Sequence, residues 1–389
     1  MIDFQFVAPT KIVFGHQAEE KVGQVAQGFG FCHALIVYGS PRIEKDLLPK
    51  VERLLQEAGI ASTRFGGVRP NPLASKVREG VALARNVGAD FVLAIGGGSP
   101  IDTAKSIAVG FYYDGDPFDF NLKKANPTKA LPIGVVLTHA SAGSEGSNSC
   151  VIQDDEIPFK GGINSDLVRP VFAIENPELT YGVSAYQTAA GASDIMMHSL
   201  ERYFDPSGEN QLCDDWALAL VKNTMTAVKR VLKDPRDYEG RAALMLNSTL
   251  SHNGLTGLGK PFGFVVHPIE HALSGYRPDI VHGAGVALIF PAWAMYVHGR
   301  DEAKFARLAR TLFNIDEPND EKASIIGITA MKEFFSSIGM PTTLKEVGLG
   351  EDDIPSLASL ATGNNTRMIG CCHQSLGKED VEAILKALL

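Results

Sequence analysis

Short, almost continuous apolar runs alternate with helical patterns in the first half of the chain. Three of these runs are followed at once by a glycine or a threonine, and they occupy residues 34–38, 91–95 and 133–137. Such runs are typical of strands that are buried on both faces of a parallel sheet. Between the first two runs, apolar residues recur at helical spacing in residues 47–58 and 77–87. The alternation predicts βαβ units, whose ligands bind at the carboxyl ends of the strands.

Helical periodicity dominates the second half of the chain, where strand-like runs are nearly absent. The helices that it predicts are at residues 184–204, 210–233, 237–258, 284–298, 301–313, 320–339 and 378–388. We therefore expect two domains, an α/β dinucleotide-binding domain over residues 1–183 and an all-α domain over residues 184–389.

The composition narrows the classes of function. The chain has 389 residues, 45% of them hydrophobic, and a formal net charge of −9. This acidic balance argues against nucleic acid as a partner, since binding to phosphates requires clustered basic residues. We expect no signal peptide and no membrane partner, because the N-terminus has no basic region and no apolar stretch reaches the roughly 20 residues of a spanning helix. The cysteines are scattered, at positions 32, 150, 213, 371 and 372, which is typical of a reduced, cytoplasmic protein.

A glycine-rich junction follows the second apolar run, in the segment Gly96-Gly97-Gly98-Ser99-Pro100. Glycines let the backbone approach a ligand closely, Ser99 suits a helix N-cap, and Pro100 suits the first helical position. Asp102 then falls at the third helical position, as in a capping box. The free N–H groups and the helix dipole predict a phosphate site, and a plain tight turn is the alternative.

Two further loops follow the other apolar runs. The segment Gly39-Ser40-Pro41-Arg42 has no acid where dinucleotide-binding folds place the carboxylate that holds the ribose 2′-hydroxyl. Arg42 suits a 2′-phosphate instead, so this loop favours NADP over NAD, and a solvated arginine at a helix start is the alternative. Thr138 and the segment Gly143-Ser144-Glu145 form a third polar loop. The three loops are expected to line one crevice.

Histidine and acidic residues cluster at ligand spacing in the second half. Asp194 and His198 are four residues apart and share one face of a mostly apolar predicted helix. His267 and His271 form a second pair of this spacing, and His282 begins another helical run, where the neutral imidazole is favoured. One carboxylate with three imidazoles suits a divalent transition metal, Fe²⁺ or Zn²⁺, whereas an isolated pair is often a surface contact.

Taken together, these motifs resemble the iron-containing (group III) alcohol dehydrogenase family, above all its butanol dehydrogenases and NADPH-dependent aldehyde reductases. The resemblance spans nearly the whole chain, and its most specific parts are residues 96–105, 190–198 and 267–285. It implies a dehydroquinate synthase-like fold with a metal-binding helical domain. It further implies that His271 does not bind the metal and is a candidate for proton relay, and that the metal ligands are Asp194, His198, His267 and His282.

The resemblance also implies that Asn71 and Lys160 lie near the nucleotide. Gly39 replaces the acid typical of NAD-preferring members, which agrees with the argument from Arg42, and Ala142 replaces a family threonine whose hydroxyl could touch the cofactor. In full, the expected cofactor-binding residues are Gly39, Ser40, Arg42, Asn71, Gly96, Gly97, Gly98, Ser99, Asp102, Thr138, Ser144 and Lys160.

We therefore expect an enzyme that transfers a hydride reversibly between NAD(P)H and a small aldehyde or primary alcohol, with NADPH preferred and NADH possible. The alternatives on the same fold are a polyol dehydrogenase of the glycerol type and a dehydroquinate synthase-like activity, for which the chain lacks an evident basic cluster near the metal motifs. A non-enzymatic nucleotide- or metal-binding protein is a more distant alternative. The family often forms dimers, and an exposed N-terminal strand is expected to pair across a two-fold axis in a homodimer.

Overall fold

The computed structural model describes residues 1–205, 210–261, 263–370 and 374–389, so Cys371 and Cys372 lie outside the described residues. The chain divides into two compact units. The α/β unit is Val7–Val183, and the helical unit combines Ser184–Leu389 with Met1–Phe6.

The first six residues thus belong to the helical unit, and the expectation that they belong to the α/β domain is wrong. Two contacts hold them there. The backbone N–H of Ile2 donates to the carbonyl of Gly259 over 2.9 Å, and the ring of Phe6 lies beside Gly254. These contacts join positions more than two hundred residues apart, so local patterning does not reveal them.

Six strands of the described chain form one parallel sheet in the order β1-β8-β5-β4-β2-β3. Their bounds are Lys11–Phe14 for β1, His33–Tyr38 for β2, Ala61–Phe65 for β3, Phe91–Gly96 for β4, Ile133–Leu137 for β5 and Phe172–Glu175 for β8. The three predicted runs are β2, β4 and β5, so they are confirmed as central strands. The pattern misses β1 and β3 because these edge strands are partly exposed, and it misses β8 because that strand has only four residues. An antiparallel pair lies beyond the sheet, with β6 at Ser149–Gln153 and β7 at Lys160–Asn164.

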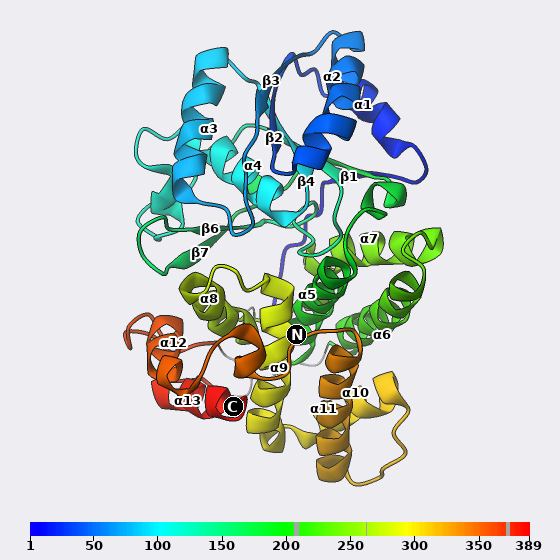
Figure 1. Ribbon diagram of the computed structural model, residues 1–389, viewed down its shortest axis with the longest axis vertical. Helices are drawn as coiled ribbons and strands as arrows, with labels where there is room; N and C mark the ends of the chain where they lie inside the picture. The colour runs from blue at the N-terminus through cyan, green and yellow to red at the C-terminus, as the bar shows by residue number, and fades with distance from the viewer. Residues whose placement is uncertain (206–209, 262, 371–373) are drawn as a thin grey trace. The chain divides into compact units, whose positions relative to one another are not determined.

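Four helices flank this sheet, namely α1 Val22–Gly28, α2 Leu48–Glu57, α3 Ala74–Val87 and α4 Gly98–Gly110 (Figure 1). Val22 of α1 and Val51 of α2 share one buried core with Ile36 of β2. Val92 and Ala94 point to the opposite face of β4 and are also fully buried. The sheet is therefore covered on both faces, which explains why its central strands are apolar throughout.

The helical unit contains the following α-helices among its described residues: α5 Ala185–Tyr203, α6 Gln211–Lys233, α7 Tyr238–His252, α8 Val266–Tyr276, α9 His282–Val297, α10 Glu302–Phe313, α11 Asp320–Ser337, α12 Ile354–Ala361 and α13 Lys378–Lys386. The predicted helix at 237–258 ends early, at His252, because Gly254 turns the backbone into the left-handed region with φ of 103°. The short 3₁₀ and π segments are Ala18–Lys21, Ile43–Leu47, Pro117–Phe120, Asp166–Val168, Pro177–Thr180, Leu255–Gly257, His298–Arg300, Leu344–Val347 and Glu351–Asp353. None of the described helices is both long and apolar enough to cross a bilayer.

Helix α5 is the buried centre of the helical unit. It packs against α6, α7 and α9, as Figure 1 shows. Ser184 caps its start by accepting a hydrogen bond from the backbone N–H of Gln187 over 3.2 Å. Every residue from Thr188 to Tyr203 is buried. A carboxylate or an imidazole on this helix therefore requires a partner, because an unpaired buried polar group is costly.

Candidate functional site

The strand order places the predicted nucleotide loops side by side. Strands β2, β4 and β5 are adjacent and parallel, so their carboxyl ends meet at one edge of the sheet. The chain leaves β2 toward β3 on one side and returns through β4 on the other, so the order reverses between β2 and β4. Open α/β sheets bind ligands at such a reversal. The backbone N–H of Thr138, just after β5, also donates to the carbonyl of Gly96 over 2.9 Å.

Helix α4 begins earlier than the sequence indicates. Its first residue is Gly98, with Gly97 as the extended N-cap, so Ser99 is not the cap and Asp102 is not the third helical position. Glycine is required before the helix because a Cβ on Gly96 would lie 2.5 Å from Cγ of Pro100. Without a side-chain cap, the first N–H groups of α4 face the edge of the sheet where a phosphate is expected.

Asp102 and Ser144 meet each other. The hydroxyl of Ser144 donates to Oδ1 of Asp102 over 2.6 Å, and the backbone N–H of Val151 donates to Oδ2 over 2.9 Å. Burial raises the pKa of Asp102, although Lys105 and the Ser144 hydrogen bond act in the opposite direction. In this structure Asp102 therefore ties α4 to the loop after β5 and to β6. A direct contact of either residue with a nucleotide stays a prediction.

In the loop after β2, Gly39 packs directly against the backbone of Val68. A Cβ on Gly39 would lie only 2.1 Å from the carbonyl oxygen of Val68, so an acidic residue has no room there. The hydroxyl of Ser40 accepts a hydrogen bond from the backbone N–H of Arg42 over 3.2 Å. The guanidinium of Arg42 lies over Gly182, where a Cβ would come within 1.1 Å of Nη1.

Asn71 and Lys160 come together although 89 positions separate them. Nζ of Lys160, at the start of β7, donates to Oδ1 of Asn71 over 3.2 Å. Asn71 adopts a left-handed backbone conformation, with φ of 53°, that asparagine tolerates better than most residues. Ala142 lies beside the start of α4, since a Cβ on Gly98 would be 3.5 Å from its methyl group. The departure from the family threonine therefore falls at the expected phosphate loop.

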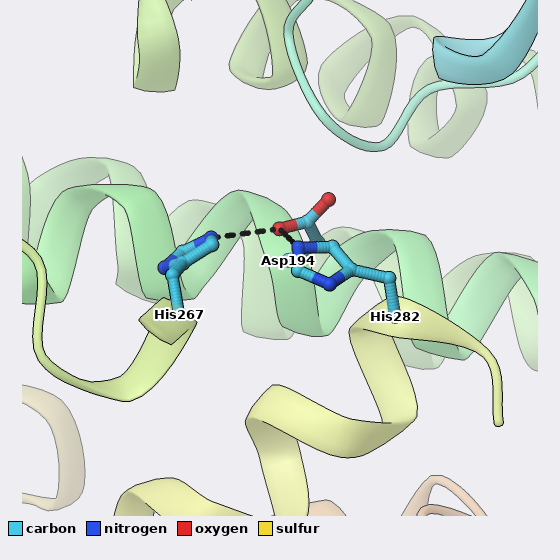
Figure 2. Close-up of side chains that lie close together, drawn as sticks. All are labelled: Asp194, His267 and His282. Carbon is cyan, nitrogen blue, oxygen red and sulfur yellow. Dashed lines mark ion pairs between the residues drawn. The ribbon is translucent and has the colours of Figure 1, made fainter. Parts of the chain in front are cut away.

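In the helical unit, the predicted metal ligands converge on the carboxylate of Asp194, and Figure 2 shows His267 and His282 beside it. Asp194 lies on α5, while His267 and His282 stand at the starts of α8 and α9. Oδ1 of Asp194 is 3.5 Å from Nε2 of His267 and 3.6 Å from Nε2 of His282. Nδ1 of His198, one turn further along α5, is 3.4 Å from the same oxygen.

These side chains fit a divalent cation. Nδ1 of His198 and Nε2 of His267 are buried, and they make no hydrogen bond to any residue that the structure describes. Both atoms face the Asp194 carboxylate. Imidazole nitrogens around one carboxylate are the donors that Zn²⁺ and Fe²⁺ accept.

The electrostatics of the cluster favour an anionic carboxylate among imidazoles. Burial acts to raise the pKa of Asp194, but the neighbouring His282 and His267 outweigh it and lower that pKa. Burial and the nearby imidazoles hold the pKa of His198 well below its ordinary value, so this ring is neutral. For His267, burial is outweighed by Glu201 and Asp194, which raise its pKa to about 9. A metal that binds His267 must therefore displace a proton.

Two glutamates contact the Nδ1 atoms of two predicted ligand histidines, and neither glutamate was predicted from the sequence. Oε2 of Glu201 contacts Nδ1 of His267, and Oε2 of Glu270 contacts Nδ1 of His282. Because a carboxylate only accepts, each Nδ1 donates and each Nε2 is left for a metal. The signal that could have found Glu201 is its place seven residues after Asp194, on the same face of an apolar helix.

Glycines explain the motif that begins at His282. A Cβ on Gly283 would lie 1.9 Å from the carbonyl oxygen of Ala190, so only glycine lets α9 approach α5 this closely. A Cβ on Gly285 would lie 2.7 Å from Cγ of Glu270. The first glycine thus brings His282 to the cluster, and the second makes room for the carboxylate behind it.

His271 lies next to the cluster. It is half-buried, and its ring centre is 5.6 Å from that of His282 and 6.3 Å from that of His267. The ligand atoms of Asp194, His267 and His282 lie within 4.8 Å of one another, and so do those of Glu270, His271 and His282, whereas His198 is in neither group. Glu270 is engaged with Nδ1 of His282 there, so the set around Asp194 is the better metal site.

Known proteins match the chain over both units. The family described as iron-containing alcohol dehydrogenase matches residues 9–177, and the C-terminal part of the Fe-containing alcohol dehydrogenase family matches residues 188–389. The NADH-dependent butanol dehydrogenase A of Clostridium acetobutylicum is 37% identical over 99% of both chains. The NADPH-dependent aldehyde reductase YqhD of Escherichia coli is 30% identical over 96% of both chains.

A solved structure confirms the fold. The crystal structure of NADH-dependent butanol dehydrogenase A from Thermotoga maritima superimposes with a TM-score of 0.95, at 35% identity, and covers 100% of this chain and 99% of that one. The similarity agrees with the resemblance found in the motifs, including the all-α second half.

Proposed function

The chain belongs to the iron-containing alcohol dehydrogenase family and acts on alcohols or aldehydes, and we propose that it interconverts small aldehydes and primary alcohols with NADPH as its preferred cofactor. The observation that carries this proposal is the convergence of three imidazoles on Asp194, with two of them backed by glutamates.

When bound, the metal would supply a Lewis acid and the reduced nicotinamide would supply the hydride. The ligands proposed to hold the metal are Asp194, His198, His267 and His282. The ionised carboxylate of Asp194 would offset part of the cation's charge, and because Asp194 is buried on α5, water would screen that attraction little.

A proton must reach the alcohol oxygen during aldehyde reduction. We assign this relay to the imidazole of His271, which is half-buried one helical turn after His267. A histidine exchanges protons readily near neutral pH. The His271→Gln variant should keep the metal and lose most of its turnover with aldehydes.

The NADPH preference is supported by the loop after β2. Gly39 has no room for the carboxylate that would hold a ribose 2′-hydroxyl, and Arg42 presents a cation at the helix start that follows. The named relatives include both NADH- and NADPH-dependent enzymes, so the preference is argued from this chain's own residues. The ratio of kcat/KM for NADPH to that for NADH tests it, and a ratio below one contradicts it.

We propose Fe²⁺ as the native metal, in keeping with the family, although the same donors accept Zn²⁺. Metal analysis of protein purified without oxygen would identify the ion. Reconstitution of the metal-free protein with each ion, followed by a panel of short aldehydes and diols, would then show which metal and which substrates support turnover.

We propose a cytoplasmic homodimer. Strand β1 is an edge strand, and its side chains Ile12 and Phe14 are 38% and 40% exposed, so a second copy could cover them. Cys32, Cys150 and Cys213 are free thiols, as expected in a reducing compartment. A monomer mass by light scattering would contradict the dimer, and recovery outside the cytoplasmic fraction would contradict the location.

A further inference from the structure

One buried carboxylate connects the metal centre to the start of helix α8. Glu201 lies on α5 and is 1% exposed. Its Oε2 accepts from Nδ1 of His267, and its Oε1 accepts from the backbone N–H groups of Val265 and Val266. Nε2 of His267 then faces Asp194, 3.5 Å from Oδ1.

Helix α8 has no cap of its own. Its N-cap residue is Val265, which carries no side-chain acceptor. The first N–H groups of a helix require acceptors, and a negative charge is favoured at this end of the helix dipole. Glu201 meets both needs from a different helix. The start of α8, and His267 with it, is therefore held by the helix that carries Asp194 and His198.

We propose that Glu201 is a positioning residue of the metal centre, which caps α8 and thereby holds His267 with Nε2 directed at Asp194. The inference deepens the proposed function and rests on it. Asp194, His198 and Glu201 follow one another at helical spacing on one face of α5. A single helix thus supplies two metal ligands and orients a third.

Glu270 provides a natural comparison. It contacts Nδ1 of His282 as Glu201 contacts Nδ1 of His267. The side chain of His282 is 24% exposed, however, against 5% for His267. Both glutamates are buried, so the two pairs differ in their imidazoles: water has access to the ring of His282 and little access to that of His267. Loss of the carboxylate should therefore harm metal binding more at Glu201 than at Glu270.

The first test measures metal affinity, which needs no turnover. Metal-free protein is titrated with Zn²⁺ against a chromophoric chelator, for the wild type and for three single Glu→Gln variants: Glu201→Gln, Glu270→Gln and the exposed control Glu239→Gln. Glutamine matches the shape of glutamate, but it has one acceptor oxygen for three donors at position 201, so its amide group must face a donor.

We expect Glu201→Gln to weaken Zn²⁺ binding by about 10–100-fold, Glu270→Gln to weaken it less, and Glu239→Gln to leave it unchanged. Equal affinity in Glu201→Gln and wild type would overturn the inference. Wild-type protein that binds no divalent metal would instead overturn the proposed function, so the two failures are distinguishable.

The second test requires no change at Glu201 and therefore holds even if that variant fails to fold. Wild-type protein labelled with ¹⁵N-histidine and loaded with Zn²⁺ reports which ring nitrogen carries the hydrogen. The ring signals of His267 are assigned by through-bond correlation with its own backbone resonances, in protein whose histidines also carry ¹³C. We expect a protonated Nδ1 and a metal-bound Nε2, a signature that a purely structural role for Glu201 does not require. A protonated Nε2 would contradict the inference.

Discussion

The proposed metal centre of the helical unit and the proposed nucleotide edge of the α/β unit are built by different means. The metal centre presents buried polar side chains from three helices, and Glu201 and Glu270 hold two of its imidazoles from behind. At the sheet edge, backbone groups rather than side chains face the expected nucleotide site. Gly39 and Gly96 lie where a side chain has no room. The first site depends mainly on which polar side chains are present, although Gly283 must also leave room for the approach of α9 to α5. The second depends mainly on positions where a side chain is absent.

The largest effect is expected at the metal centre. His267→Ala removes a proposed ligand and leaves Glu201 without its imidazole partner, so both metal binding and turnover should be lost. Metal content and the rate of NADPH oxidation with butyraldehyde measure this. His16→Ala is the control, since the side chain of His16 is 65% exposed. Full activity in metal-stripped His267→Ala protein would rule out a metal-dependent mechanism.

Gly283→Ala tests whether the proposed metal centre also depends on a glycine, because Gly283 directly follows the proposed ligand His282 and packs against α5. The new Cβ would lie 1.9 Å from the carbonyl oxygen of Ala190 and would push the start of α9, with His282, away from α5. Overpacking of this kind costs about 1–3 kcal/mol of unfolding free energy. Chemical denaturation and Zn²⁺ titration should both show the loss.

The control for that variant is Gly299→Ala, since a Cβ on Gly299 would meet no atom within 4 Å. Metal affinity that is unchanged in Gly283→Ala would show that α9 can retreat without moving His282. The proposed metal centre would then depend on its polar side chains alone, and the nucleotide edge would be the region that depends on glycines.

At the sheet edge, Gly39→Ala should weaken binding of both cofactors without affecting the metal. The added Cβ would lie 2.1 Å from the carbonyl oxygen of Val68, so the loop after β2 must move. We expect higher KM values for NADPH and NADH alike and an unchanged metal content. Gly28→Ala is the control, because a Cβ there would meet nothing within 4 Å. Unchanged KM values would mean that this loop does not bind the cofactor.

The smallest effect is expected for Arg42→Ala, which removes the one charged side chain that we propose to contact the cofactor in the loop after β2. Loss of one charged hydrogen bond to a 2′-phosphate should raise the KM for NADPH about tenfold and leave that for NADH unchanged. Arg53→Ala, at an exposed position on α2, is the control. Equal changes with the two cofactors would remove the basis of the proposed NADPH preference.

Each of the two regions could be predicted from the sequence only in part. The Asp194–His198 pair was accessible from spacing along one helix, and the apolar runs of β2, β4 and β5 revealed the central strands. The contact of Glu201 with His267 spans 66 positions, and that of Lys160 with Asn71 spans 89. Spacing along a single element carries no information about such pairs. The start of α4 was misplaced because a serine and a proline suggested a cap, whereas packing at Gly96 and Gly97 decides where the helix begins.

The sequence by itself determined the kinds of element, their approximate order and the residue types capable of holding a metal, because helical and strand periodicity are local properties. Only the tertiary structure decided which glutamate stands behind which histidine, and that the first six residues join the helical unit. The physical reason is that these features depend on how closely two helices approach. That distance is set by glycines such as Gly283, whose role is visible only when the opposing backbone is in place.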